Sequence, residues 1–219
     1  MKRFAIYGAS GFGREVLPVA RQQLKLTETQ DWDLTFVDDH PQAPHFNGHK
    51  VLTYANWLSL PAQSSNICLA IANSAVREKL AARCFGDGVA FFDVKASNSL
   101  VLDDVQIGIG SILCPFVTLT SNIQIGQQFH ANIYSYVAHD CVIGDFVTFA
   151  PGVHCNGNVH IEDHAYIGTG AILRQGKPGE PLVIGRGAVV GMGAVVTKNV
   201  AAGTTVVGNP ARVLEPRFK

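Results

Sequence analysis

The chain has 219 residues, of which 17 are Lys or Arg and 17 are Asp or Glu, so its formal net charge is zero. Charged residues make up 16% of the sequence, against about 25% in an average soluble domain. The 47% of hydrophobic residues excludes a disordered chain, and the neutral balance predicts no nucleic-acid partner and no anionic membrane surface.

The segment from Val105 to His139 contains no Asp, Glu, Lys or Arg. A transmembrane helix is excluded there, because polar residues and glycines interrupt the stretch before it reaches about 18 apolar residues. The first residues, MKRFAIYGAS, turn polar too early for a secretory signal. Without such a signal, five cysteines that include no CxxC pair indicate reduced thiols. We therefore expect a cytoplasmic protein without membrane insertion.

Residues 1–96 alternate between strand-like and helix-like segments. Strands are expected at Phe4–Tyr7, Leu34–Val37, Ile67–Ala72 and Ala90–Val94. Helices are expected around Val16, Ala20 and Leu24, and over Ser74–Cys84 with Arg77, Lys79 and Arg83 on its solvent face. This alternation predicts a small Rossmann-like α/β domain with a parallel sheet.

A glycine-rich loop follows the first expected strand. Gly8, Gly11 and Gly13 form GxxGxG, which lets a backbone approach a phosphate at the N-terminus of a helix. Asp38 and Asp39 end the second strand, where a carboxylate can reach a ribose hydroxyl. A polar turn would explain the two aspartates equally well. The glycine pattern is a weak signal of nucleotide binding, because it lacks the GxGxxG spacing of dinucleotide-binding loops.

From Val101 onward, every sixth residue is apolar. The series is Val101, Ile107, Leu113, Leu119, Ile125, Ala131, Val137, Ile143, Phe149, Cys155, Ile161, Ile167 and Leu173. A period of six is typical of a parallel β-helix, in which each hexad is a short strand and a turn, and the turns need glycine or small residues. The series resumes at Ile184, Val190 and Val196, so an inserted loop of five extra residues is expected within Arg174–Leu182.

His139 is the strongest candidate for chemistry in the repeat. It stands two residues after Val137, a member of the every-sixth series whose side chains should point into the prism. The His139 side chain should therefore point outward from a turn, and Asp140 follows it. A neighbouring carboxylate makes an imidazole more basic and selects its tautomer, as a general base requires. The alternative is an ordinary surface histidine.

Cysteine and metal chemistry are both disfavoured by position. Cys141 and Cys155 occupy inward positions, where burial should raise the pKa of each thiol and make it a poor nucleophile. The histidines lack the spacing of a His-x4-His zinc pair, so no metal is expected.

Several segments together resemble a known family. They are GASGFGRE, FVDD, AIANSAVREKL, HANIYSYVAHDCVIGDFVTFAPG, GMGAVVTK and GNPAR, which cover nearly the whole chain. The chain resembles bacterial sugar acyltransferases of the sialic-acid O-acetyltransferase type, especially the nucleotide-sugar N-acetyltransferases of bacillosamine and perosamine synthesis.

The resemblance implies a fold, partners and site residues. The fold would be a Rossmann-like nucleotide-sugar-binding domain over residues 1–96, then a left-handed parallel β-helix acetyltransferase domain over residues 97–219. The protein would form a homotrimer that binds acetyl-CoA between neighbouring prisms. His139 matches the catalytic base, Asp140 its acidic partner and Asn132 a contact to the reacting sugar.

The remaining matched positions fall into two groups. The nucleotide sugar would contact Gly8, Gly11, Phe12, Gly13, Asp38 and Asp39. Acetyl-CoA would contact the backbone around Gly157, Thr169 and Met192. Thr148 stands where some relatives carry a second active-site histidine, so it would supply a polar contact to the sugar or acetyl group rather than a second imidazole.

The expected activity is therefore acetyl-CoA-dependent N-acetylation of a UDP- or GDP-linked 4-amino-4,6-dideoxy sugar for bacterial surface glycans. His139 would act as the base for direct transfer, and a backbone N–H would stabilise the oxyanion. Two alternatives stay open at this stage: a sugar O-acetyltransferase of the sialic-acid type, and a non-catalytic trimer that binds a nucleotide sugar.

Overall fold

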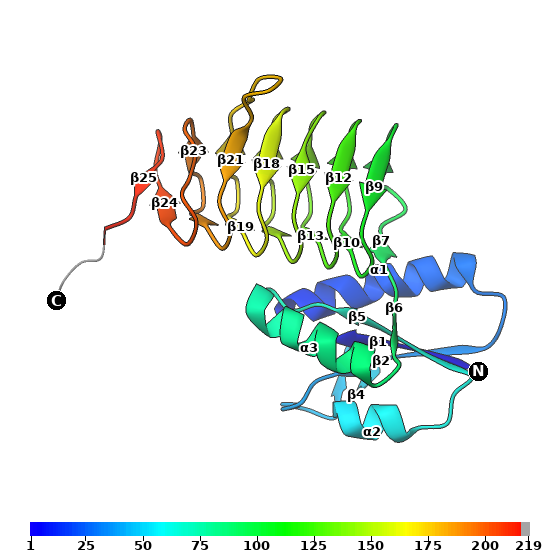
Figure 1. Cartoon of the computed structure of the whole chain (residues 1–219). Helices are drawn as coiled ribbons and strands as arrows, with labels where there is room; N and C mark the ends of the chain where they lie inside the picture. The colour runs from blue at the N-terminus through cyan, green and yellow to red at the C-terminus, as the bar shows by residue number, and fades with distance from the viewer. Residues whose placement is uncertain (216–219) are drawn as a thin grey trace. The chain divides into compact units, whose positions relative to one another are not determined.

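The computed structural model describes residues 1–215 and separates into two compact units. The first comprises Met1–Ser97 with Ile109–Ile112, and the second comprises Asn98–Gly108 with the chain from Leu113 onward. Within residues 1–215 the first unit contains three helices and an open sheet. The second unit is a stack of short-stranded coils, as Figure 1 shows.

The first unit is built on a sheet with the strand order β3-β4-β2-β1-β5-β6. Its strands are β1 (Lys2–Tyr7), β2 (Trp32–Val37), β3 (His45–Phe46), β4 (His49–Leu52), β5 (Ser64–Leu69) and β6 (Ala90–Phe91), and β7 (Val94–Lys95) follows them. All neighbours in this sheet pair in parallel except β3 and β4. The expected parallel sheet is confirmed for β1, β2, β5 and β6. The antiparallel β3–β4 pair was not expected, and Asn47 and Gly48, both with positive φ, close it as a tight hairpin.

Three helices accompany this sheet: α1 (Gly11–Thr27), α2 (Tyr54–Ser59) and α3 (Ser74–Gly86). The buried face of α1 includes Val16, Ala20 and Leu24, as their helical spacing predicts. Helix α3 begins where the Asn73 side chain accepts a hydrogen bond from the Val76 N–H. Neither α2 nor the β3–β4 hairpin was expected from the sequence.

Arg77 corrects the expected solvent face of α3. Its side chain is fully buried, and its guanidinium donates to the carbonyl oxygens of Ile71 (2.6 Å) and Ala72 (3.3 Å). Burial lowers the pKa of this guanidinium to about 9. An arginine at helical spacing looks like a surface residue in sequence, but here it satisfies two carbonyls of the preceding loop.

The second unit is a parallel β-helix with three faces. One face carries β8 (Leu100–Val101), β11 (Thr118–Leu119), β14 (Tyr136–Val137), β17 (His154–Cys155), β20 (Ile172–Leu173) and β23 (Val195–Val196). A second carries β9 (Val105–Ile107), β12 (Ile123–Ile125), β15 (Val142–Ile143), β18 (Val159–Ile161) and β21 (Leu182–Ile184). The third includes β10 (Ile112–Leu113), β13 (His130–Ala131), β16 (Thr148–Phe149), β19 (Tyr166–Ile167), β22 (Val189–Val190), β24 (Thr205–Val207) and β25 (Arg212–Val213).

The register confirms the hexapeptide repeat. Leu119 pairs with Val137 and Val137 with Cys155, so one coil takes 18 residues, or three hexads. The every-sixth column is buried from Leu113 through Leu173. Leu173 pairs with Val196, an offset of 23, which confirms five extra residues between β20 and β21.

Most turns of the β-helix have left-handed backbone three residues after the inward position; the exceptions are Gly176 and Asn199. That position has positive φ at Asp104, Phe116, Asn122, Gln128, Tyr134, Asp140, Phe146, Asn158 and His164, and at several glycines. The expectation of small or glycine turn residues is therefore too narrow. Ring stacking offsets part of the energetic cost of the αL backbone at two corners. The Phe116 and Tyr134 rings stack with their centroids 5.0 Å apart, and the Phe146 and His164 rings stack at 5.4 Å.

Within residues 1–215, none of the helices has the length and apolar character that a membrane crossing requires.

Candidate active site

The turns that follow β8, β11, β14, β17, β20 and β23 form one edge of the prism, which we call the His139 corner. His139 lies in the turn after β14, and 45% of its side chain is exposed. Its Nδ1 lies 2.7 Å from Oδ2 of Asp140. Because an ionised carboxylate can only accept a hydrogen bond, Nδ1 of His139 carries the proton and donates it to Asp140. Nε2 is then the unprotonated, basic nitrogen of the ring.

Asp140 is oriented from both sides. Its Oδ1 accepts a hydrogen bond from the Asn122 amide at 3.3 Å, while Oδ2 faces His139. These two hydrogen bonds, the one with His139 first, lower the pKa of Asp140 below its usual range. Asp140 has φ of 57°, the αL conformation in which Asp and Asn are tolerated better than most residues.

Gly157 forms the floor beneath the imidazole. It occupies the place of His139 one coil further on, and a Cβ built on it would stand 2.5 Å from Cε1 and 2.6 Å from Nε2 of His139. The ring therefore occupies space that any other residue would fill. In addition, Gly157 is buried and its N–H makes no hydrogen bond within residues 1–215.

Asn132 lies at a different edge of the prism. The turns after β10, β13, β16, β19 and β22 form what we call the Asn132 corner, which also contains Thr169 and Met192. The Asn132 amide donates to the Phe149 carbonyl at 3.2 Å, and Met192 is 81% exposed. The three residues do not join His139 within one chain, because β14 separates the two corners.

Thr148 belongs to the face before the Asn132 corner. It lies on β16, pairs with His130 and Tyr166, and is 4% exposed. Its expected contact with the sugar stays a prediction.

The two inward cysteines differ from the expectation in one respect. A hydrogen bond with the Cys155 thiol lowers the pKa of Cys141 despite burial, whereas the same hydrogen bond and burial raise the pKa of Cys155. The expected high pKa is thus wrong for Cys141. Both thiols are nevertheless inaccessible, with 0% exposure, so neither can act as a nucleophile toward a bound thioester.

The glycine-rich loop of the first unit divides into structural and open positions. A Cβ on Gly8 would lie 2.9 Å from the Ala70 carbonyl oxygen, and one on Gly13 would collide with the Gly8 carbonyl. Packing alone therefore requires these two glycines. Gly11 has nothing within 4 Å of the same point, and Phe12 beside it is half-buried, so this end of the loop is open to a ligand.

The two aspartates after β2 have separate partners. Asp38 accepts hydrogen bonds from the backbone N–H groups of Ala9 (3.1 Å) and His40 (3.0 Å), which ties the glycine-rich loop to β2. Asp39 accepts from the Tyr7 hydroxyl (2.6 Å) and from Arg83 (3.1 Å).

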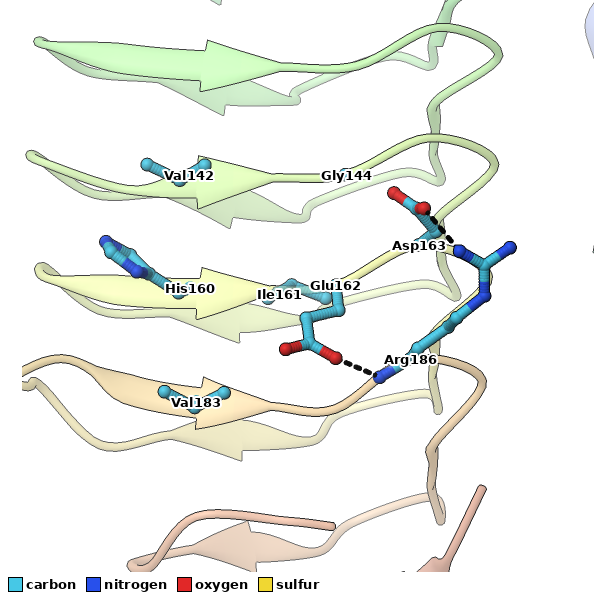
Figure 2. Close-up of a pocket in the computed structure, with 8 residues that line it drawn as sticks. All are labelled: Val142, Gly144, His160, Ile161, Glu162, Asp163, Val183 and Arg186. Atoms are coloured by element: carbon cyan, nitrogen blue, oxygen red, sulfur yellow. Dashed lines mark hydrogen bonds and ion pairs between the residues drawn. The ribbon is translucent and has the colours of Figure 1, made fainter. Parts of the chain in front are cut away.

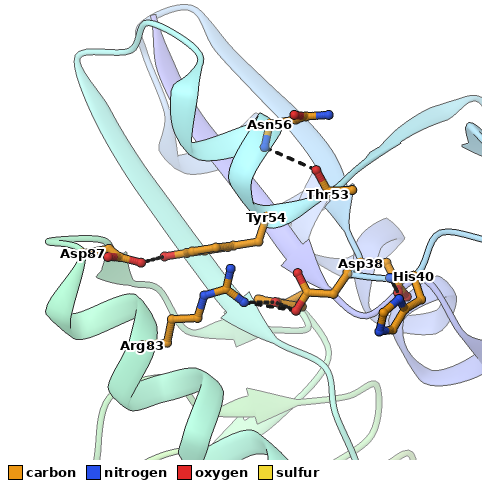
Figure 3. Close-up of polar contacts among 9 residues, drawn as sticks. Asp38, His40, Thr53, Tyr54, Asn56, Arg83 and Asp87 are labelled. Carbon is orange, nitrogen blue, oxygen red and sulfur yellow. Dashed lines mark hydrogen bonds and ion pairs between the residues drawn. The ribbon is translucent and has the colours of Figure 1, made fainter.

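Arg83 connects Asp39 to an aromatic surface. Its guanidinium also lies over the Tyr54 ring at 4.1 Å, and the Tyr54 hydroxyl donates to Asp87 (Figure 3). Burial and the hydrogen bond to Asp39 raise the pKa of Tyr7, so its hydroxyl stays a donor. The helical spacing predicts a solvent-facing Arg83, and no motif in the sequence indicates this cluster.

A shallow pocket of about 430 Å³ lies on the β15–β18–β21 face (Figure 2). Its charged groups already have partners: the Glu162 carboxylate accepts from the backbone N–H of Arg186 at 2.7 Å, and the Arg186 guanidinium forms an ion pair with Asp163 at 2.9 Å. None of the residues expected from the sequence to act in catalysis or binding lines it. Its chemistry therefore does not compete with that of the His139 corner.

A β-helix of hexapeptide repeats with an oriented, exposed histidine at a corner, in one chain with a Rossmann-like domain, defines the class of hexapeptide-repeat acyltransferases. Comparison with known proteins narrows this class. Residues 3–84 match the PglD N-terminal domain family model. The chain is 50% identical over 215 residues to GDP-perosamine N-acetyltransferase of Escherichia coli O157:H7, covering 98% of this chain and 97% of that protein. The chain belongs to the PglD-type family of nucleotide-sugar N-acetyltransferases.

Solved structures agree over nearly the full length. WeeI from Acinetobacter baumannii AYE has 59% identity and a TM-score of 0.93, with 98% of this chain and 100% of that chain covered. The acetyltransferase domain of PglB from Neisseria gonorrhoeae FA1090, in complex with acetyl coenzyme A, has 28% identity and a TM-score of 0.84, with 97% and 98% covered. The expected fold class, an α/β domain followed by a left-handed β-helix, is confirmed.

Proposed function

We propose that this protein transfers the acetyl group of acetyl-CoA to the 4-amino group of a GDP-linked 4-amino-4,6-dideoxy sugar of the perosamine type. The observation that carries the proposal is the His139 imidazole, held by Asp140 at 2.7 Å above the bare backbone of Gly157. The full-length likeness to GDP-perosamine N-acetyltransferase supports GDP as the nucleotide and an amine as the acceptor.

Each residue of this site then has a defined task. Acetyl-CoA supplies an activated acetyl thioester. Nε2 of His139 accepts the proton that the sugar ammonium must lose before its nitrogen can attack the thioester carbon. The C–S bond then breaks, and coenzyme A leaves as a thiolate that takes up the second proton of the nitrogen. Asp140 keeps Nδ1 protonated and balances the positive charge that the ring acquires. The Gly157 N–H donates toward the thioester oxygen as negative charge develops there.

The first unit is the proposed site for the nucleotide. Gly11 and Phe12 present the open end of the loop, and the N–H groups of the first turn of α1 favour a diphosphate. Asp38 uses both carboxylate oxygens on backbone N–H groups, so its role is to shape the loop. Both hydrogen bonds to Asp39 go to Oδ2, and Oδ1 has no hydrogen-bond partner within residues 1–215, which suits a ribose hydroxyl.

A homotrimer is the proposed assembly. Asn132, Thr169 and Met192 lie at one corner, whereas His139, Asp140 and Gly157 lie at another, so a single prism cannot offer both groups to one substrate. Placing the His139 corner of one chain against the Asn132 corner of the next unites them, and three-fold symmetry closes such a contact into a ring.

The test is a coenzyme-A release assay with GDP-perosamine and, in parallel, with the matching GDP-linked sugar that carries a 4-hydroxyl group. We expect turnover with the amine only, and we expect His139→Ala to lose about two to four orders of magnitude in kcat. Turnover confined to the hydroxyl acceptor would make the protein an O-acetyltransferase. No release with any nucleotide sugar, or a His139→Ala variant as fast as the parent, would overturn the proposed mechanism.

A further inference from the structure

A buried thiol interrupts an aliphatic column of the β-helix directly beside the His139 corner. The column on the β15 face consists of Val105, Ile123, Cys141, Val159 and Leu182. Strands β9, β12, β18 and β21 begin at this position, whereas β15 begins one residue later, so the ladder that joins β12, β15 and β18 leaves Cys141 out (Figure 1). Packing does not require a thiol here, because a branched aliphatic residue fills the same position one coil before and one coil after.

The Cys141 thiol lies between two backbone carbonyls of the His139 corner. Its Sγ is 3.3 Å from the Asn156 carbonyl oxygen and 3.6 Å from that of His139. The His139 carbonyl already accepts from the Asn158 N–H at 3.0 Å. The Asn156 carbonyl, by contrast, accepts only from thiols within residues 1–215, from Cys141 and at 3.8 Å from Cys155. Cys141 is therefore the nearer donor to a carbonyl that no backbone N–H serves.

The Asn156 carbonyl and the Gly157 N–H belong to one peptide unit. Because a peptide unit is planar and trans, its C=O and N–H point in opposite directions. A carbonyl that is held toward the inward-facing thiol thus directs the N–H outward, to the corner where the His139 ring lies over Gly157. A hydrogen bond to the carbonyl also polarises the unit, which makes its N–H a stronger donor.

The preceding coil has the same backbone without this donor. Ile123 occupies the place of Cys141 there, and Ala138 occupies the place of Asn156. In the part of the chain that the structure describes, residues 1–215, the Ala138 carbonyl accepts no hydrogen bond. The fold therefore tolerates this carbonyl without a donor, and the thiol supplies one at the coil that contains Gly157.

We propose that Cys141 is a positioning residue for acetyl transfer, whose thiol holds the Asn156 carbonyl and so aims the Gly157 N–H at the thioester oxygen. This inference rests on the proposed function, because that function assigns the Gly157 N–H to the developing negative charge. The Cys155 thiol is hydrogen-bonded to Cys141 and extends the same chain of donors. Cys141 touches no substrate and forms no covalent intermediate.

The experiment compares three replacements of Cys141 in the full chain. Cys141→Val fills the space with a residue type that the same column contains, but removes the donor. Cys141→Ala also removes the donor and leaves a cavity, whereas Cys141→Ser keeps an O–H that can donate. Ile123→Val is the matched control, because it alters packing one coil earlier, beside a carbonyl that has no donor.

We expect Cys141→Val and Cys141→Ala to lower kcat by the same factor, about tenfold, which is part of the loss of about a hundredfold or more that follows removal of an oxyanion donor. The KM values for acetyl-CoA and for the amino sugar should not change. Thermal unfolding should separate the two variants, because only alanine leaves a cavity. Cys141→Ser should recover most of the lost kcat, and Ile123→Val should keep the parent value.

Two further measurements separate positioning from general damage. The acidic limb of the kcat/KM profile against pH reports the base, so it should be the same in the parent and in all variants. In nitrogen–proton NMR spectra, the Gly157 amide resonance should move in Cys141→Val and stay in place in Ile123→Val.

Full turnover in Cys141→Val would overturn this inference. So would a kcat that follows thermal stability, lower in Cys141→Ala than in Cys141→Val and not restored in Cys141→Ser, since Cys141 would then act through packing alone. If Cys141→Val did not fold, equal kcat in the serine and alanine variants would overturn the inference in its place. None of these results affects the proposed function, which fails only if His139→Ala turns over like the parent or no nucleotide sugar is acetylated.

Discussion

Gly157 is constrained by a neighbouring side chain rather than by its own backbone conformation. Its φ is not positive, yet a Cβ there would come within 2.5 to 3.0 Å of three atoms of the His139 ring. We predict that Gly157→Ala displaces the imidazole and lowers kcat by about a hundredfold, the cost of a shift near 1 Å in a reacting group. KM for the acceptor sugar should change little.

Gly187→Ala is the matched control for that variant. Gly187 also lies in a β-helix turn, at a different corner, and has open space around it with φ of 64°. Alanine there should cost about 1 kcal/mol of stability through backbone strain, with full activity. If Gly157→Ala lost only stability and kept its turnover, the imidazole would not depend on this glycine.

Asn122 determines the ionisation of Asp140 together with His139. Hydrogen bonds from both residues lower the pKa of Asp140, so the carboxylate form is stabilised. Because the folded pKa is depressed, this stabilisation is complete above the ordinary carboxyl pKa and disappears only as pH falls through the lower folded value. We predict that Asn122→Ala raises the pKa of Asp140, measured by NMR titration of the carboxyl carbon.

The same variant should lower turnover modestly at neutral pH, since Asp140 stays ionised there but loses one of its two orienting contacts. Ser121→Ala, one residue earlier in the same turn, is the comparison that should leave the Asp140 titration unchanged. An Asp140 titration identical in Asn122→Ala and the parent would show that the 3.3 Å contact has no electrostatic consequence.

At the scale of elements, the glycines directly after the inward column set how closely successive coils approach. A Cβ on Gly126 would lie 2.8 Å from the Asp145 backbone nitrogen, and the Asp145 carboxylate crosses above it to accept from the Gln127 N–H. We predict that Gly126→Ala destabilises the protein by about 1 to 3 kcal/mol in denaturant unfolding. Gly86→Ala near the end of α3, where space is open, should change stability by less than about 1 kcal/mol.

The elements also show which features a single sequence can reveal. The β-helix was predictable because one apolar column repeats every six residues, and the inserted loop was predictable because it breaks that phase. The Asn47-Gly48 dipeptide is a recognisable hairpin signal, but the alternation of strand-like and helix-like segments does not predict the two short strands that it joins.

The candidate site was predictable only in part, for a geometric reason. His139 and Asp140 are adjacent in sequence, so their pairing could be inferred. Asn122 and Gly157 reach the same site from 18 residues on either side, an offset that has meaning only once the three-hexad coil is known. Arg83 reaches Asp39 through the fold of the first unit, and no spacing in the sequence encodes that contact.

At the scale of the whole molecule, the distribution of the expected site residues makes the assembly testable by complementation. If each site combines the His139 corner of one chain with the Asn132 corner of the next, His139→Ala and Asn132→Ala damage opposite halves. A mixed trimer then contains interfaces in which an intact His139 corner, from the Asn132→Ala chain, faces an intact Asn132 corner from the His139→Ala chain.

We predict that two differently tagged variants, co-expressed and purified through both tags, recover activity that neither variant has alone. Purification through both tags leaves only trimers that contain both variants, and one of the three interfaces in each is fully intact, so turnover should approach about a third of the parent value. His139→Ala mixed with Asp140→Ala is the control, because both changes fall on the same corner and no interface escapes damage. No recovery by the first pair would mean that each prism builds its site alone, whereas equal recovery by the control pair would show that the gain does not come from joining an intact His139 corner to an intact Asn132 corner.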